Sequence, residues 1–261
     1  MDSVRYVTAE RVAHLTLDRP EALNALTPDQ RDHVIRLLAG ASGDPGIGAV
    51  VITGTGRGFC AGADLRGGGA TAERVPGDVA RTIRLGAQRL IAAVLDCEKP
   101  VIAAVNGTAA GLGAHLALAC DLVLAAESAR FIEVFVRRGL VPDGGGAYLL
   151  PRLVGPQRAK ELMFFGDALS APEAERMGLV NRVVPDEELA KTAREWAVRL
   201  AAGPTRTLAL TKQLLNASLD GDRASAFTAE AAAQEINMTT HDAQEGLRAF
   251  TERRSPVFRG R

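Results

Sequence analysis

Strand patterns and helical patterns alternate through the first half of this chain. The strand patterns are short apolar runs at residues 12–17, 49–53, 101–105 and 122–125. Helical patterns separate them at residues 28–41, where Thr27 can cap the first turn, and at residues 78–96. Because a helix between two strands usually returns the chain to a parallel strand, this alternation predicts an α/β fold with a parallel sheet at its centre.

The second half of the chain has a different pattern. Amphipathic helices are predicted at residues 187–201, 205–219, 224–236 and 243–253, with one short strand near Val183. This half of the chain has too few predicted strands to form a second sheet-based domain. We therefore expect a core at residues 1–195 that carries the site, followed by a helical extension at residues 196–261 that covers the core or reaches a neighbouring chain. The Gly- and Pro-rich residues 67–77 predict a mobile loop.

Charge and cysteine content argue against several classes of protein. Basic and acidic residues both number 31, so no net field attracts nucleic acid or anionic lipid. The N-terminus lacks the apolar region of a signal peptide, and no apolar run reaches the roughly 18 residues of a membrane span. The odd set of Cys60, Cys97 and Cys120 predicts reduced thiols and a cytoplasmic protein. The four histidines lack metal-ligand spacing, so no metal is expected.

Two glycine-rich loops, residues 54–65 and 105–116, each follow a predicted strand directly. Ligands of parallel α/β proteins bind at the carboxyl ends of strands, and glycine lets backbone amides approach them closely. The second loop also opens a helix, whose first N–H groups are free to bind an anion. Either loop alone is compatible with a tight turn. Together they predict a site where an oxyanion receives two backbone hydrogen bonds.

The chain resembles the crotonase superfamily, also called the enoyl-CoA hydratase/isomerase superfamily. Besides the two loops, the resemblance rests on residues 17–26 (LDRPEALNAL), 139–145 (GLVPDGG), 150–155 (LPRLVG) and 174–180 (AERMGLV). It implies a spiral of stacked ββα units, with C-terminal helices that build a trimer or a dimer of trimers. It also implies a coenzyme A thioester as substrate, with no separate cofactor.

Carried over by position, the resemblance implies that the N–H groups of Ala63 and Leu112 form the oxyanion hole. Leu112 stands where the family usually has glycine, which is tolerable if the backbone there suits a residue with a side chain. The Ala61 carbonyl would accept a hydrogen bond from the adenine. The residues expected along the coenzyme A path are Ala22, Asp64, Leu65 and Arg66, with Arg19 or Arg66 near the phosphates.

The acid and base of a typical family hydratase are two glutamates, and their positions match His115 and Phe135 here. Simple hydration is therefore in doubt. Asp143, in the turn Val-Pro-Asp-Gly-Gly, matches the position where isomerase-like members carry a catalytic aspartate. From local sequence alone, a structural role for Asp143, as a turn residue or a helix N-cap, is as well supported as a catalytic role. As a base it would need a raised pKa, which the apolar neighbours Phe135, Leu140 and Val141 can supply by desolvation.

Three other residues have open roles. His115 is either a packed helix residue or a group that contacts the substrate. Glu133 would be a second acid if the alignment shifted by two residues. Cys60 has no basic neighbour in sequence and is assigned to packing.

The leading hypothesis is an isomerase that moves the double bond of an unsaturated acyl-CoA, with Asp143 as acid and base. A second is a hydratase of 2-enoyl-CoA, a lyase, that uses Asp143 with His115 or Glu133 around a water. A third is a family member that binds acyl-CoA without turnover. A nucleic-acid module is the least supported. Acyl chain and pathway are left open.

Overall fold

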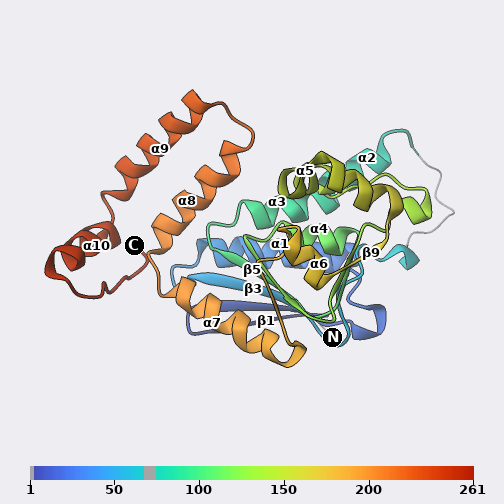
Figure 1. Cartoon of the computed structure of the whole chain (residues 1–261), viewed down its shortest axis with the longest axis horizontal. Coiled ribbons are helices and arrows are strands. Elements are labelled where there is room, and N and C mark those ends of the chain that lie inside the picture. The colour runs from blue at the N-terminus through green and yellow to red at the C-terminus, as the bar shows by residue number, and fades with distance from the viewer. Residues whose placement is uncertain (1–2, 68–74) are drawn as a thin grey trace.

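The structure is a computed structural model, and it describes residues 3–67 and 75–261. A six-stranded sheet with the order β1-β2-β3-β5-β7-β10 lies at its centre (Figure 1). Its strands are Val4–Ala9, Val12–Leu17, Ala49–Gly54, Val101–Val105, Leu122–Ala126 and Arg182–Val184. Only the β1–β2 pair is antiparallel, and the other neighbours in this sheet are parallel. The predicted parallel α/β core is confirmed.

A second sheet of four short strands stands beside the first. Its order is β4-β6-β8-β9, with the bounds Gly58–Cys60, Thr108–Ala110, Arg130–Ile132 and Ala168–Ser170. A strand of the large sheet is followed three times by a strand of this small sheet and then by a helix, which is the expected ββα repeat. The sequence did not predict these strands, because three residues are too few to establish a strand period.

Helices cover the large sheet and support the two loops. Helix α1, Pro28–Gly43, begins with the predicted Thr27 cap, which forms a capping box with Gln30. The helix predicted at residues 78–96 is present as α2 (Asp78–Ile83), a π-helical turn and α3 (Arg89–Leu95). The remaining core helices are α4 Leu112–Leu118, α5 Gly146–Phe165, α6 Ala171–Arg176 and α7 Leu189–Ala201.

The last three helices leave the core. They are α8 Thr205–Ser218, α9 Arg223–Asn237 and α10 His241–Glu252, and Figure 1 shows them as an arm beside the central sheet. The domain boundary expected after residue 195 falls inside α7, whose Ala197 and Ala201 belong to the buried core. The arm is tied to the core by Lys212, whose ammonium group lies 2.9 Å from an Asp121 carboxylate oxygen.

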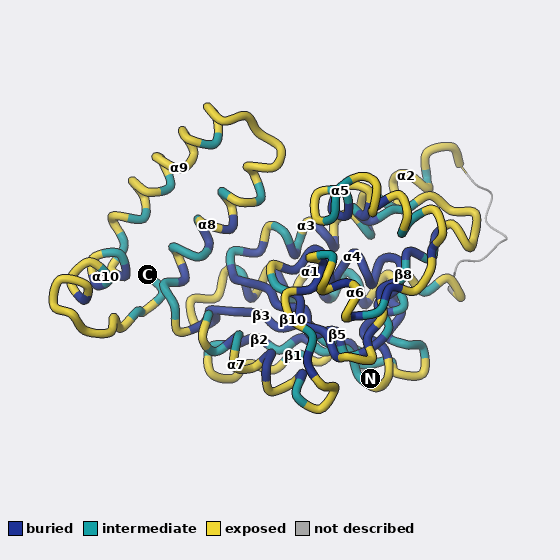
Figure 2. The backbone as a smooth tube through the Cα atoms, in the orientation of Figure 1, coloured by how far each residue is buried: buried dark blue, intermediate teal, exposed yellow. Residues whose placement is uncertain are grey.

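The arm is much less buried than the rest of the chain, as Figure 2 shows by its yellow backbone. Helix α9 has no buried residue at all. Among the described residues, no helix is long and apolar enough to cross a membrane. Residues 68–74, which make up most of the loop predicted to be mobile, lie outside the described residues.

Candidate active site

The two predicted loops meet at the start of α4. A β-carbon added to Gly62 would lie 2.8 Å from the Ala110 carbonyl oxygen and 3.3 Å from the Leu112 nitrogen. Gly62 also has a φ of 95°, which side chains rarely adopt. Only glycine therefore allows the first loop to lie this close to the N-terminus of α4.

The amide of Ala63 is turned away from the strand-like segment beside it. The Leu26 amide donates to the Gly62 carbonyl at 2.8 Å, and the Asp64 amide donates to the Leu26 carbonyl at 2.9 Å. This parallel bridge uses the groups on either side of Ala63, so the N–H of Ala63 points away from Leu26. It has no acceptor within residues 3–67 and 75–261.

The amide of Leu112 is free for a different reason. Leu112 is the first residue of α4, and the first N–H groups of a helix have no acceptor within it. The positive φ at this corner, 53°, belongs to Gly111, and Leu112 is not among the described residues with positive φ. A leucine therefore fits where the family usually has glycine, since only its amide is needed.

Asp143 lies half-buried in the turn that precedes α5. Gly145, not Asp143, is the N-cap of α5, and no side chain caps the helix. In the described part of the chain the Asp143 carboxylate makes no hydrogen bond or ion pair, so the N-cap interpretation does not hold. Burial raises the pKa of Asp143 above its usual range, and this effect outweighs the opposite influence of the nearby His115 ring.

The apolar groups around the Asp143 turn differ from those expected. Leu140 and Val141 are 51% and 83% exposed, so they contribute little to the burial of Asp143, whereas Phe135, the third residue expected there, is buried. In a tight turn, adjacent side chains point outward. A β-carbon added to Gly144 would instead lie 2.7 Å from Leu112 Cδ1 and 3.5 Å from the Ala87 β-carbon, so α4 and the π-helical turn surround the turn.

His115 is fully buried one turn after Leu112. Its Nε2 lies 3.0 Å from Glu133 Oε2, and its ring stacks on Phe135 with centroids 5.3 Å apart. Glu133 is 6% exposed and follows β8. The Glu133–His115 pair was not predicted, because no local pattern links residues 18 positions apart on different elements. The Glu133 carboxylate is thus bound to His115, and its role as a second acid stays a hypothesis.

The residues expected along the coenzyme A path form one ridge. The Ala61 amide donates to the Leu23 carbonyl at 2.9 Å, which places Ala22 beside Ala61. Asp64 accepts hydrogen bonds from Arg66 at 3.0 Å and from Arg19 at 2.7 Å, and these two guanidinium groups hold the pKa of Asp64 well below its usual range.

The two arginines on this ridge differ in exposure. Arg19 is 22% exposed and also donates to the Ala25 carbonyl, whereas Arg66 is 66% exposed. The exposed guanidinium of Arg66 is therefore better placed to meet a phosphate. Leu65 beside it is 59% exposed. Cys60 is fully buried, and burial raises the pKa of its thiol to about 12, in keeping with packing.

Two asparagines that sequence reasoning missed brace the first loop. Asn24 donates to the carbonyls of Thr55 and Gly58 at 2.9 and 2.8 Å. Asn106 accepts from the Gly54 amide at 3.1 Å and donates to the Gly56 carbonyl at 2.9 Å. Both asparagines lie in the quoted motifs, but their side-chain contacts depend on folding.

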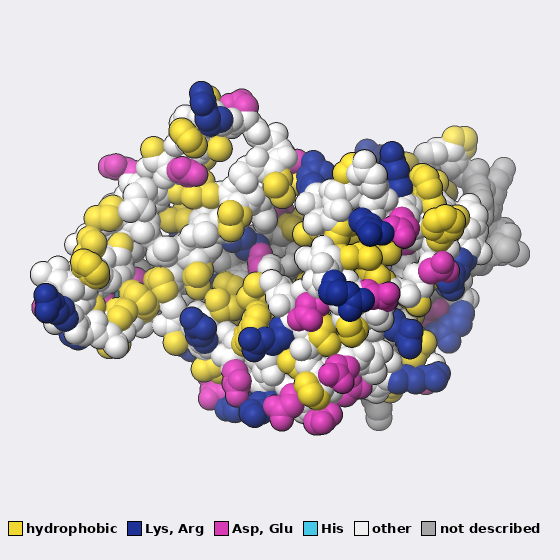
Figure 3. All heavy atoms as spheres, viewed as in Figure 1, with side chains coloured by type: hydrophobic (Ala, Val, Ile, Leu, Met, Phe, Trp, Pro, Cys, Tyr) yellow, Lys and Arg dark blue, Asp and Glu magenta, His cyan; other side chains and the backbone are white. Residues whose placement is uncertain are grey.

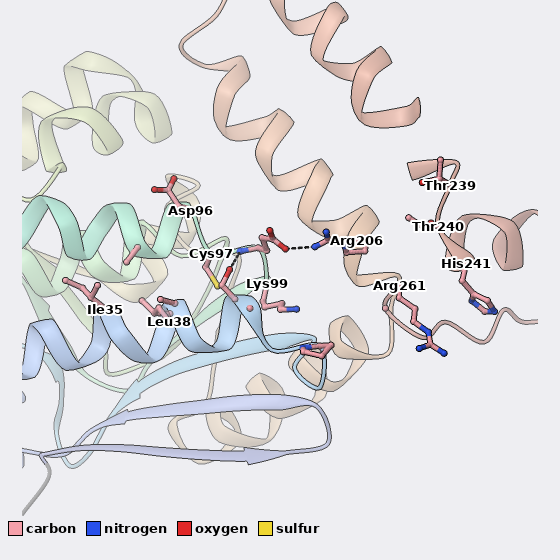
Figure 4. A pocket seen from close by; sticks show the side chains of 17 residues that line it. Ile35, Leu38, Asp96, Cys97, Lys99, Arg206, Thr239, Thr240, His241 and Arg261 are labelled. Atoms are coloured by element: carbon pink, nitrogen blue, oxygen red, sulfur yellow. Dashed lines mark hydrogen bonds and ion pairs between the residues drawn. The ribbon is translucent and has the colours of Figure 1, made fainter. Parts of the chain in front are cut away.

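A large cavity lies away from this site. It has a volume of about 960 Å³ and opens between α1, the end of α3 and the arm (Figure 4). Its lining includes Leu38, Lys99, Arg206 and His241, and none of the predicted site residues. Among the described residues there is no cluster of three His, Cys, Asp or Glu that could hold a metal ion.

Residues 8–261 match the family described as enoyl-CoA hydratase/isomerase, and the chain belongs to that family. The family acts on acyl-CoA thioesters. A Rhodobacter capsulatus protein named "Probable enoyl-CoA hydratase" is 41% identical over 259 residues, with 99% of this chain and 98% of that protein covered. The 1,2-epoxyphenylacetyl-CoA isomerase of Escherichia coli is 40% identical over 250 residues, covering 96% and 95%.

The crystal structure of an enoyl-CoA hydratase/isomerase from Cupriavidus metallidurans has a TM-score of 0.93 and 38% identity, covering 100% of this chain and 97% of that one. Because both hydratases and an isomerase are similar to the chain, these likenesses define the family and leave the reaction open.

Proposed function

We propose that this enzyme moves the double bond of an unsaturated acyl-CoA, with Asp143 as the acid and base. The observation that carries the proposal is the half-buried carboxylate of Asp143, which has no partner among residues 3–67 and 75–261 and lies in a turn packed on Leu112. A carboxylate without a partner is free to take a proton, and burial raises its pKa and so its basicity.

The chemistry follows from three groups. The thioester oxygen accepts hydrogen bonds from the amides of Ala63 and Leu112. Asp143 removes a proton from a carbon conjugated to the thioester, and the electron pair moves onto the thioester oxygen as an enolate. The same proton returns from Asp143 to a different carbon of the acyl chain. The double bond has then moved and the enzyme is unchanged.

Among the described residues of the site, no second acid is free of a partner, and this supports isomerisation over hydration. Phe135 is buried against His115, and Glu133 is bound to His115 Nε2. Hydration remains the second candidate, because several relatives are named hydratases.

A substrate panel separates these reactions. We expect 3-enoyl-CoA and 2-enoyl-CoA to interconvert, and water addition to 2-enoyl-CoA to be much slower. The measurement is the initial rate with each ester, with products separated by chromatography and identified by mass, since hydration adds one water whereas the two enoyl isomers share a mass and differ in retention. Faster hydration would assign the hydratase instead. Binding of every ester with no product would indicate a non-catalytic binder.

We also propose that the arm assembles the chain into a trimer or a dimer of trimers. Large apolar side chains are exposed along it, and Figure 3 shows such side chains gathered there. They include Leu215, Leu219, Phe227, Ile236, Leu247 and Phe250. Exposed apolar patches of this kind mark sites of association.

Light scattering should give three or six times the 27.5 kDa of one chain. The Phe250 side chain is 85% exposed, so it makes few contacts within one chain. Phe250→Glu should therefore reduce the assembly mass without unfolding the protein. Val7→Glu, at a residue 61% exposed on β1, is the matched control and should keep the assembly. A wild-type mass of one chain would refute the assembly.

A further inference from the structure

The Nδ1 atom of His115 has an unusual position. Among the side-chain nitrogen and oxygen atoms of residues 3–67 and 75–261, it is the one buried atom with no hydrogen-bond partner. Leaving a buried polar atom unpaired costs about 1–3 kcal/mol. A group of this kind in a native protein calls for an explanation, such as a partner that arrives during function.

The ring that carries this atom is held on several sides. Glu133 Oε2 lies 3.0 Å from Nε2, and the Phe135 ring stacks on one face at an interplanar angle of 12°. Gly146 lies at the ring edge, because a β-carbon added there would be only 2.1 Å from Nε2. The ring therefore has one orientation, in which Nδ1 lies beside the turn that follows Asp143.

The position of Glu133 determines which nitrogen carries the proton. An ionised carboxylate can only accept a hydrogen bond, so it requires a proton on His115 Nε2. A neutral imidazole then has a bare Nδ1, which is an acceptor. Nδ1 would lie 3.6 Å from a β-carbon added to Gly144, the residue after Asp143.

An acceptor at this place needs a donor, and Asp143 becomes one only in part of the reaction. As a carboxylate it has no proton to donate. After it has taken a proton from the acyl chain, it carries an O–H group one residue before Gly144, the residue that lies beside Nδ1 of His115. The protonated Asp143 carboxyl can therefore supply the hydrogen bond that Nδ1 of His115 lacks.

We propose that Glu133 and His115 form a buried positioning pair for Asp143, in which Nδ1 of His115 accepts a hydrogen bond from the protonated Asp143 carboxyl. The inference rests on the proposed role of Asp143 in proton transfer. The proton stays on Asp143 and returns from it to the acyl chain, so His115 and Glu133 end each cycle unchanged. The bond stabilises the enolate intermediate and not the bound substrate, so it acts on kcat and little on KM.

Two substitutions at His115 separate the two ring nitrogens. The terminal amide of Asn lies near the position of Nδ1, and that of Gln lies near the position of Nε2. His115→Asn keeps a group beside Asp143, whereas His115→Gln keeps a partner for Glu133. We expect kcat to be about tenfold higher in His115→Asn than in His115→Gln, with similar KM, since they differ by about one hydrogen bond. Equal kcat values, or the reverse order, would overturn the inference.

A spectroscopic measurement tests the same atoms without relying on turnover. Substituting His14, His33 and His241 by Gln leaves His115 as the only histidine, and none of the three lies in the site. A long-range ¹H–¹⁵N spectrum at neutral pH should show a proton on Nε2 and a bare Nδ1. A proton on Nδ1 would refute the inference, even if the substituted His115 variants failed to fold.

Asp143→Asn in this background places a permanent N–H donor beside Nδ1. We expect the ¹⁵N resonance of Nδ1 to move in the direction of a hydrogen-bonded acceptor, and Asp143→Ala to leave it in place. An unmoved resonance in both variants counts against the pair. If Asp143→Asn were still fully active, the proposed function itself would fail. Loss of activity with an unmoved resonance would reject only the positioning pair.

Discussion

Asp143→Asn is expected to slow double-bond migration by about a hundred- to ten-thousandfold, the usual contribution of a general acid and base. Asn has nearly the same shape as Asp but cannot accept the proton. Since the Asp143 carboxylate has no partner in the described part of the chain, the substitution breaks no contact. The measurement is kcat with the preferred 3-enoyl-CoA, alongside the dissociation constant of a saturated acyl-CoA, which should change little.

Stability provides an internal control for this variant. Burial raises the pKa of Asp143 above its unfolded value, so the folded state holds the ionised form less well than the unfolded chain does. That cost applies above the raised pKa and disappears as the pH falls below the unfolded pKa. The neutral Asn side chain removes it, and the melting temperature at pH 7 should be equal to or higher than that of the wild type.

Activity of the wild type should fall as the pH drops through the raised pKa of Asp143, because only the ionised form is a base. Asp167→Asn, at an exposed carboxylate, is the matched control and should retain activity. An Asp143→Asn variant with wild-type turnover would remove Asp143 from the mechanism.

Leu112→Pro is expected to lower kcat by about a hundred- to a thousandfold, because it deletes one N–H donor of the oxyanion hole. Backbone donors are usually inaccessible to mutagenesis. Here Leu112 is the first residue of α4, the helix position where proline is best tolerated, since the missing N–H has no acceptor in the helix. The preceding residue is Gly111, which gives the backbone the most freedom beside a proline.

Leu112→Ala is the control for this experiment, since it loses the same side-chain packing but keeps the amide. The comparison that matters is the ratio of kcat between the two variants, with circular dichroism and melting temperature to confirm that both fold. Similar kcat values would show that the Leu112 amide does not bind the thioester oxygen.

The parts of the fold that sequence predicted are those with long buried patterns. Strands β2 and β5 have the predicted bounds, because five or six consecutive residues packed between helices leave a clear apolar run. Strands β4, β6, β8 and β9 have three residues each, and their pairing depends on neighbours far away in the chain. No local signal marks such strands.

The candidate site divides in a similar way. The free amides follow from features that are local in sequence, a glycine-rich turn and the first residue of a helix. The surroundings of the Asp143 turn do not, because Gly144 in this turn lies against Leu112 of α4 and near Ala87, while Leu140 and Val141 are exposed. The Glu133–His115 contact likewise exists only after β8 and α4 pack together.

The side chain of Leu112 lies against Gly144, so the two positions share one space in the site. Leu112 Cδ1 occupies the space in which a side chain at residue 144 would begin, 2.7 Å from its β-carbon. A side chain at residue 144 would therefore have to displace the end of the Leu112 side chain. The Leu112 side chain thus fills the space between the start of α4 and the turn after Asp143, a space that a glycine at residue 112 would leave open.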